Sequence, residues 1–375
     1  MSNDSLSQTA VATLTAARPT APPPTTTPPR AGARRDRYLD FLRFLAIARI
    51  IVYHSSGFVW LTYVFPAMGV MFALGGSLMA NSLANPTGRP VRKRVRRLLP
   101  ALWVFGAVVV PAMFVQAVRE NDIRDLPGFE GLFAWVFPIV DPPGTEWAEP
   151  ATVVLWYLVT YLWLVMLSPL AIRAYRRWPL PTVLTPLAAL IVIALGGLTL
   201  DSGLGAVALN LATYGSCWLI GFAHRDGRLA EVPLPVLIGV AAVAMIAGGL
   251  WAFTHPTETG LDLNNIPLAQ GLYSLGFVLL AMRVRPSLAW LRRVVVLDWL
   301  VTAANARAVT IYLWHNPAIS MSYPIGDWLD VWRLGNRGGD VLCLLIAVVL
   351  VAVATVALGW IEDMAAGRRP RLIPR

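Results

Sequence analysis

Arg43 and His54 are the residues whose types and spacing most directly suggest chemistry. They lie eleven positions apart in an apolar stretch, so an α-helix places them on one face, about 20° from overlap and about 16 Å apart along the axis. Ionisable side chains inside a membrane are functional hypotheses by default. A guanidinium at the entrance and an imidazole deeper in suit an anionic substrate whose reactive end reaches into the membrane, although neighbouring helices could equally satisfy both side chains. Arg49 lies about 140° around the helix axis from His54, and this position favours a structural role for Arg49.

A run of basic residues at 92–97 precedes a second apolar stretch. Such runs commonly mark only the cytoplasmic end of a membrane span. This run is dense, however, and Arg94 and Arg97 are three positions apart, so they share one face of a helix. Two guanidinium groups on one face can bind phosphate through bidentate hydrogen bonds. The run therefore predicts either a topology signal or a phosphate-binding clamp.

Two later apolar stretches also carry polar and aromatic side chains. His315 is predicted to lie at a depth comparable to that of His54, and it competes with His54 for the role of a base. Aromatic residues near a membrane surface usually form an interfacial belt, but they can also stack on a sugar or another ring-shaped acceptor. The residues that we expect to bind the acceptor or to support the site are Trp156, Tyr157, Arg307, Tyr312 and His315.

The composition places these residues in an integral membrane protein. Hydrophobic residues make up 57% of the 375 residues and charged residues only 14%, and the mean hydropathy is +0.60. Soluble domains have about 25% charged residues, so we expect an all-α, polytopic membrane fold instead. Two cysteines exclude a disulfide framework, and four scattered histidines exclude a local zinc cluster, so no metal is expected.

Motifs of several other enzyme classes are absent from the sequence. It contains no P-loop, no G-x-S-x-G, no H-E-x-x-H and no D-x-D pair, which argues against ATP hydrolysis, serine hydrolysis, metalloprotease activity and metal-dependent glycosyl transfer. The net charge of +10 would suggest a nucleic-acid partner in a soluble protein. In a membrane protein the location of the charges matters more, and no nucleic-acid partner is expected.

Ten apolar segments approach the length of roughly 20 residues that a membrane-spanning helix needs. The first and ninth are the least apolar, and a further segment at 130–140 is too short, so we expect it to be re-entrant or to lie on the membrane surface. The ten predicted spans are 39–59, 62–84, 98–118, 151–171, 181–199, 204–223, 233–253, 266–282, 294–320 and 340–361.

The loop charges predict the orientation of these spans. Of the 31 Lys and Arg residues, 24 fall on the side of the N-terminus and four on the opposite side. The positive-inside rule then places both termini and the basic loop 85–97 in the cytoplasm, and the acidic loop 119–150 outside a multi-pass cell membrane. The predicted parts are a disordered Pro/Thr-rich tail at 1–37, a transmembrane domain at 38–362 and a basic tail at 363–375.

Five motifs, in order, resemble those of the membrane acyltransferase 3 family. The first is R-Y-L-D-F-L-R-F-L-A at 37–46 followed by His54, which matches the family's arginine, ten residues and then histidine. The resemblance covers 37–361, and ten spans match the family's membrane core. The other motifs are F-P-A at 65–67 with M-F-A-L-G-G at 71–76, R-V-R-R-L-L-P at 94–100, L-W-Y-L at 155–158 and I-Y-L-W-H at 311–315.

The resemblance implies an O-acyltransferase that moves an acyl group from cytoplasmic acyl-CoA to a hydroxyl of a glycan, lipid, glycolipid or secondary metabolite. Acetyl-CoA is the expected co-substrate, no cofactor is expected to stay bound, and the lipid bilayer is the remaining partner. If the family's motif residues have the same roles in this chain, His54 would be the catalytic base or a transient acyl carrier. Arg43, Arg94 and Arg97 would bind the donor's phosphates. A thioester needs neither metal nor ATP to donate its acyl group.

Two departures from the family's motifs leave the acceptor class open. Gly75 stands where many members have serine, and Tyr157 replaces the serine of a Trp-Ser-Leu-x-x-Glu run whose glutamate is also missing. Because the chain ends at Arg375, we expect no fused extracytoplasmic domain.

Two other function classes remain open. A transporter or flippase for an anionic metabolite or glycolipid would use Arg43, Arg307 and His54 as a substrate or proton path, and it predicts flux without bond formation. Such transporters often consist of two similar halves, which are not visible in this sequence. A catalytically inactive scaffold is the third interpretation.

Overall fold

A computed structural model of the chain describes residues 36–84, 88–200, 203–284 and 286–372. Within these ranges every regular element is a helix, as predicted. The predicted tail 1–37 lies almost entirely outside the described residues. The long helices are α1 (Arg37–Ser56), α3 (Ala67–Leu83), α4 (Pro90–Glu120), α7 (Leu155–Arg177), α8 (Pro179–Leu195), α9 (Gly203–Arg225), α11 (Leu234–Thr254), α12 (Pro267–Arg283), α13 (Val295–Ala306), α14 (Ala308–Trp328) and α15 (Gly335–Leu358); the short ones are α2 (Trp60–Val64), α5 (Phe129–Val136), α6 (Glu149–Thr152), α10 (Arg228–Glu231) and α16 (Trp360–Ala365).

Six helical segments within the described residues are long and apolar enough to cross a membrane, so the predicted number of ten is not confirmed. Helix α1 contains Asp40, Arg43 and Arg49, whose charges lower its hydropathy, and α8 and α12 have only 17 residues each. The six segments are Trp60–Leu83, Pro90–Glu120, Leu155–Arg177, Gly203–Arg225, Leu234–Thr254 and Val331–Leu358.

The predicted ninth span, 294–320, is wrong as a single helix, because the chain breaks into α13 and α14 at Arg307. The fully buried Arg307 guanidinium pairs with Asp363 of α16, with 2.6 Å between Nη2 and Oδ2. Glu362 of α16 accepts hydrogen bonds from the backbone N–H (2.8 Å) and the hydroxyl (2.7 Å) of Thr310. The carboxylate thereby satisfies a free N–H at the start of α14, which stabilises the break.

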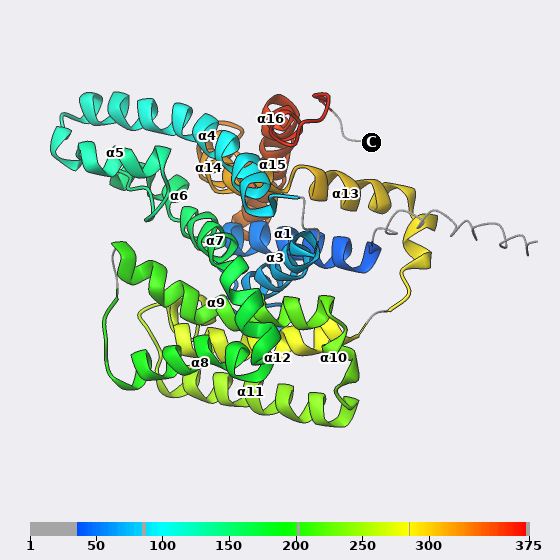
Figure 1. Ribbon diagram of the computed structural model, residues 1–375. Helices are drawn as coiled ribbons and strands as arrows, with labels where there is room; N and C mark the ends of the chain where they lie inside the picture. The colour runs from blue at the N-terminus through cyan, green and yellow to red at the C-terminus, as the bar shows by residue number, and fades with distance from the viewer. Residues whose placement is uncertain (1–35, 85–87, 201–202, 285, 373–375) are drawn as a thin grey trace, which may run out of the picture. The chain divides into compact units, whose positions relative to one another are not determined.

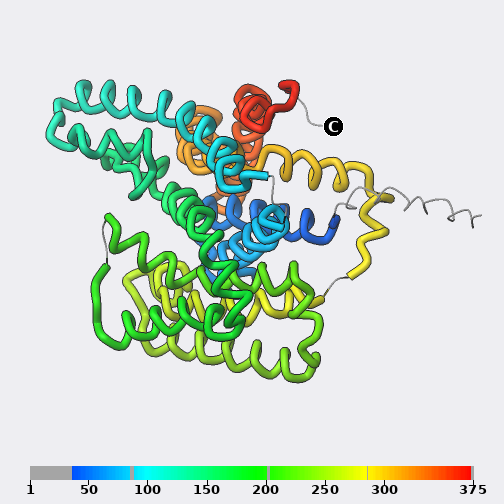
Figure 2. The backbone as a smooth tube through the Cα atoms, viewed as in Figure 1, coloured from blue at the N-terminus to red at the C-terminus, as the bar shows by residue number. Residues whose placement is uncertain are grey.

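The helices of the unit that begins at Arg37 pack in two groups around α1 and α3 (Figures 1 and 2). Helices α8, α9, α11 and α12 lie together below α3 in this view, and α4, α13, α14, α15 and α16 lie above it. Helices α3 and α9 approach closely because their contact is made of small residues. A Cβ atom on Gly76 would collide with the backbone of Trp218, and one on Gly221 would collide with the backbone of Ala73.

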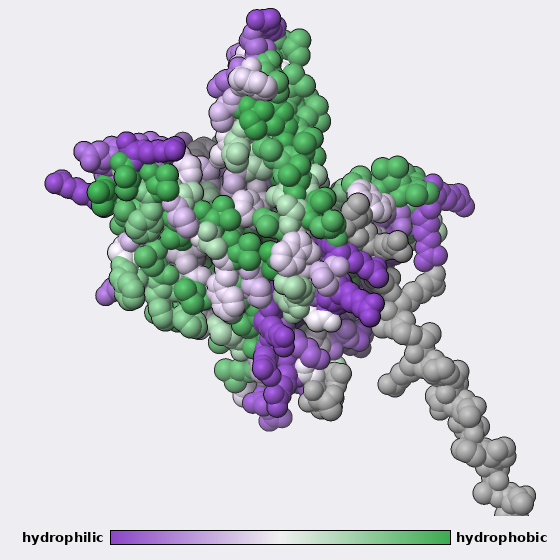
Figure 3. All heavy atoms as spheres, turned by 90° about the horizontal axis from the view of Figure 1, so that it is seen from above, coloured by the Kyte–Doolittle hydropathy of each residue, from purple (hydrophilic) through white to green (hydrophobic). Residues whose placement is uncertain are grey.

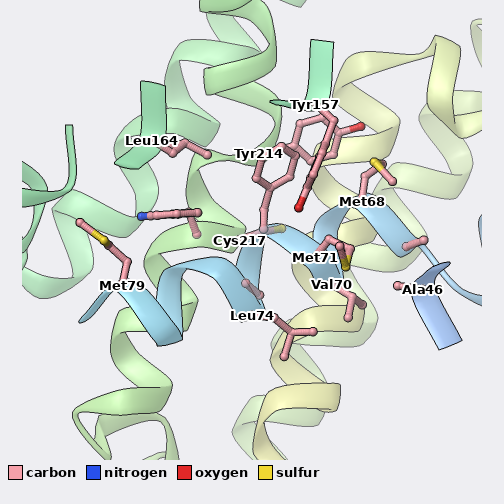
Figure 4. Packing of buried hydrophobic residues seen from close by; sticks show 14 of the residues in the cluster. Ala46, Met68, Val70, Met71, Leu74, Met79, Tyr157, Leu164, Tyr214 and Cys217 are labelled. Carbon is pink, nitrogen blue, oxygen red and sulfur yellow. The ribbon is translucent and has the colours of Figure 1, made fainter. Parts of the chain in front are cut away.

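Side chains of α3 form the centre of the largest buried apolar cluster (Figure 4). Met71 and Leu74 lie against Tyr214 and Cys217 of α9 and near Tyr157 of α7. The packing fixes α3, α7 and α9 relative to one another. It therefore also sets the positions of the aromatic side chains that α7 and α9 contribute to the candidate site.

Large apolar side chains also cover much of the surface, and hydrophilic residues gather in separate patches (Figure 3). Helix α11 exposes Val236, Val240, Val243, Leu250 and Phe253. A soluble monomer rarely exposes apolar patches of this extent, so this surface and the six apolar helical segments indicate a membrane protein.

Candidate active site

A small cavity of about 140 Å³ brings together the three arginines that were predicted to bind phosphate. Arg43 comes from α1, and Arg94 and Arg97 come from the first turns of α4. Tyr161 of α7 and Asn305 of α13 complete the polar part of the lining. We call this space, with its three arginines, the basic cavity. The helical spacing of Arg94 and Arg97 does place both on one face, as predicted.

Neutral side chains hold two of these arginines in place. Arg43 Nη1 donates to Asn305 Oδ1 at 2.9 Å, and Asn305 Nδ2 in turn donates to the backbone oxygen of Asp40 at 2.8 Å. Arg94 Nη1 donates to the Tyr161 hydroxyl at 2.8 Å. The buried Arg94 Nε has no partner among the described residues. The guanidinium groups are thus oriented before any anion binds, and their charge is not neutralised by these partners.

A larger cavity of about 580 Å³ contains His54, whose side chain is exposed to it. We call it the histidine cavity. Its aromatic walls come from Trp156 of α7 and Tyr214 of α9. Hydrogen-bonding groups around it come from Tyr53, Asp141, Asn210, Asn264 and Asn265.

His54 and His315, which were predicted to lie at similar depths, are neighbours in the structure. Their ring centroids are 5.3 Å apart. His315 is 1% exposed, and its Nδ1 lies 2.5 Å from the backbone oxygen of Tyr312. A carbonyl can only accept a hydrogen bond, so Nδ1 carries the proton and Nε2 of the neutral ring is an acceptor. The buried Nε2 has no protein partner among the described residues, whereas His54 is open to the cavity.

Asp141 is a site residue that the sequence analysis missed. It belongs to the predicted outer loop between α5 and α6, and it lines the histidine cavity. Burial raises the pKa of the Asp141 carboxyl to about 6, because the charged form loses hydration. Its buried Oδ1 accepts no hydrogen bond from the described residues, so an acceptor hydroxyl could donate to it.

Arg49 also lines the histidine cavity, although its helical position favoured a role elsewhere. Its guanidinium carbon lies 4.6 Å from the centre of the Tyr53 ring, and its Nε donates to the backbone oxygen of Leu61 at 3.2 Å. The Tyr53 hydroxyl donates to Asp262, which also accepts from the backbone N–H of Asn264 at 2.9 Å. These contacts tie the end of α1 to the short helical turn at Leu263–Asn265.

A layer of aromatic rings separates the two cavities. Tyr312 lines both of them, Tyr157 lines the basic cavity, and the adjacent Trp156 lines the histidine cavity. The Tyr157 and Tyr312 ring centroids are 4.9 Å apart, and the Tyr312 hydroxyl donates to the backbone oxygen of Val154. Helix α1 passes alongside, with Arg43 at one cavity and His54 at the other. All five of these predicted residues therefore lie between or beside the two cavities.

Arg307 lines neither cavity. Its contacts are the ion pair with Asp363 and a hydrogen bond of 2.6 Å from Nη2 to the backbone oxygen of Arg371. Burial raises the pKa of the neighbouring Glu362 carboxyl. The sequence analysis did not identify either acidic partner. Among the described residues, no three His, Cys, Asp or Glu side chains are grouped to hold a metal ion.

Comparison with known families agrees with this geometry. Residues 36–361 match the model of the acyltransferase 3 family, which is described as an acyltransferase domain. The chain matches no curated protein and no solved structure. The match spans the same helices that supply the basic cavity and the histidine cavity.

Proposed function

Because the chain belongs to the acyltransferase 3 family and is an acyltransferase, we propose that it transfers an acyl group from cytoplasmic acyl-CoA to a hydroxyl of an acceptor in the histidine cavity. The observation that carries this proposal is the pair of cavities that meet at Tyr312. One is basic and suits a phosphorylated donor. The other contains an accessible imidazole and suits a hydroxyl that must lose a proton.

The orientation of the two cavities follows from the predicted topology. Arg94 and Arg97 lie within the predicted cytoplasmic loop 85–97, whose later part forms the first turns of α4, whereas Asp141 belongs to the predicted outer loop. The donor would therefore enter from the cytoplasm of a cell-membrane protein with cytoplasmic termini. Its thioester would pass the layer of Tyr157 and Tyr312, and the acceptor would enter from the opposite side.

In the proposed reaction, His54 accepts the proton of the acceptor hydroxyl. The oxygen attacks the thioester carbonyl carbon, a C–O bond forms, and the C–S bond breaks. The coenzyme A thiolate leaves and takes the proton back from the imidazolium. A positioned general base contributes about 10²- to 10⁴-fold to such a reaction. His315 would position the acceptor or the His54 ring, because its own side chain is enclosed.

The lining of the histidine cavity supports a polyhydroxylated, ring-shaped acceptor, such as a glycan, a glycolipid or a glycosylated metabolite. Trp156, whose ring stacks on the buried ring of Tyr214, offers an aromatic surface for a sugar ring. Asp141, Asn210 and Asn264 offer acceptors and donors for its hydroxyl groups. Acetyl is the proposed acyl group, as the resemblance to the family implies.

The test uses purified full-length protein in detergent with radiolabelled acetyl-CoA and candidate glycan or glycolipid acceptors. We expect labelled product and release of coenzyme A with the wild type, and loss of at least about 10²-fold in turnover with His54→Gln, which removes the base. His54→Gln should still bind acetyl-CoA, because the basic cavity is intact.

Two results would overturn the proposal. One is near-wild-type turnover of His54→Gln. The other is movement of an anionic substrate across proteoliposomes without formation of an ester, which the transporter interpretation predicts. His315→Gln is the matched comparison, since it removes the second imidazole; if only this variant is inactive, the roles of the two histidines are exchanged.

A further inference from the structure

A groove of about 780 Å³ follows the outer side of the start of α4. It lies between the end of α3, the first turns of α4 and Pro169 of α7. Its volume falls within the range of about 300–1,000 Å³ that is typical of sites for small molecules. It is lined by different arginines from those of the basic cavity.

Three arginines, Arg89, Arg92 and Arg96, border this groove and line it mainly with the apolar parts of their side chains. Arg92 and Arg96 are four positions apart and share one face of α4, and Arg89 lies just before the helix begins at Pro90. Arg94 and Arg97 face the basic cavity instead. The dense basic run thus divides into two faces with separate surroundings.

The side chains of these three arginines are exposed, and none has a hydrogen-bond or ion-pair partner among the described residues. Like charges at such spacings on a helix repel each other. An anion bound between Arg92 and Arg96 would relieve this repulsion and form charge-assisted hydrogen bonds with both guanidinium groups.

The rest of the groove is apolar. Its walls are formed by Leu83, Val91, Val95, Leu99, Trp103 and Pro169. The distance from Arg92 to Trp103 along the helix axis is about 16 Å. The groove therefore combines a cationic end with an apolar channel long enough for a substantial part of an acyl chain.

Helix α4 is one of the six segments that can cross a membrane, so the apolar part of the groove faces lipid. The predicted topology places its basic end at the cytoplasmic leaflet, where anionic lipids are concentrated. We infer that the groove binds one anionic phospholipid of this leaflet, with its phosphate between Arg92 and Arg96 and one acyl chain along Val95, Leu99 and Trp103. The bound lipid would hold the start of α4, whose other face carries Arg94 and Arg97.

The test measures lipid retention by native mass spectrometry of the full chain in detergent. The protein is titrated with phosphatidylglycerol or with phosphatidylcholine that has the same acyl chains. We expect preferential retention of one phosphatidylglycerol, weakened about tenfold or more in Arg92→Gln/Arg96→Gln, which loses two charge-assisted contacts. The matched control is Arg292→Gln/Arg293→Gln, which removes the same charge from two other exposed arginines and should retain the lipid like the wild type.

Each alternative predicts a different result. Equal retention of both lipids by the wild type, or equal losses in the two double variants, would overturn a specific site. Displacement by glycerol 3-phosphate would indicate a phosphate site without a role for the acyl chain. Displacement by coenzyme A would assign these arginines to the donor, and the inference would fail although the proposed acyl transfer could stand.

Discussion

Replacing Arg94 by alanine should weaken the binding of acetyl-CoA about ten- to a hundred-fold, because a lost charge-assisted contact costs about 1.5–3 kcal/mol. Arg97→Ala should have a similar effect, since its side chain lines the same small cavity. Both residues lie at the start of α4 and are only partly buried, so neither substitution should prevent folding.

The hydrogen bond between Arg94 and Tyr161 allows the effect of charge to be separated from the effect of orientation. Tyr161→Phe removes the hydroxyl that accepts from Arg94 Nη1 at 2.8 Å and leaves the guanidinium in place. A neutral hydrogen bond of this kind contributes about 0.5–1.5 kcal/mol. We therefore expect a loss of donor affinity of about two- to tenfold, smaller than that of Arg94→Ala.

Isothermal titration calorimetry of purified protein with acetyl-CoA provides the affinities, and thermal unfolding checks that each variant is folded. Arg92→Ala/Arg96→Ala is the matched control, because it removes two charges from the same run on the face that lines the outer groove. The reasoning is refuted if this control loses as much affinity as Arg94→Ala/Arg97→Ala. The run would then act through its total charge and not through the face that meets the basic cavity.

Three further predictions concern the topology, the outer loop and the packing. Glu130→Cys should react with an impermeant maleimide on intact cells and Arg96→Cys only after permeabilisation; the reverse pattern would overturn the proposed orientation. Because burial raises the pKa of Asp141 to about 6, its folded form prefers the proton, so wild-type stability should fall relative to Asp141→Asn as the pH rises from about 4 to about 6.5. The difference is about 1–2 kcal/mol once solvent screening of this half-buried side chain is included; parallel melting curves of the two proteins across this range would contradict it. Gly75→Ser should cost about 1–3 kcal/mol by overpacking, because a Cβ there would lie 2.7 Å from the Trp218 ring, and an unchanged thermal midpoint would show that the ring can move.

Relationships within a single helix could be predicted from the sequence. The spacing of Arg94 and Arg97 placed both on one face, and the structure confirms that both line one cavity. This prediction succeeds because helical geometry is a local property.

Relationships between distant segments could not be predicted in this way. Asp141 reaches the histidine cavity only because the outer loop folds back beside α1 and α7. The break at Arg307 depends on Asp363 and Glu362, which are more than fifty positions away in the sequence. Arg49 has structural contacts with Tyr53 and Leu61, and it also lines the histidine cavity because the angle between Cα positions does not limit where a long guanidinium side chain ends.

The buried Arg307 and the partly buried arginines of the basic cavity differ in their hydrogen-bond partners. Arg307 is paired with Asp363, so its charge is compensated within the protein, and removing either partner would leave an unpaired buried charge. Arg43 and Arg94 are instead held by the neutral side chains of Asn305 and Tyr161. Hydrogen bonds to neutral groups orient a guanidinium without cancelling its charge, so the basic cavity keeps a positive potential that an anionic ligand must balance. The carboxyl groups of Asp40 and Glu362 interact electrostatically with Arg43 and Arg97 respectively, and in the proposed function a phosphorylated acyl donor would supply further negative charge.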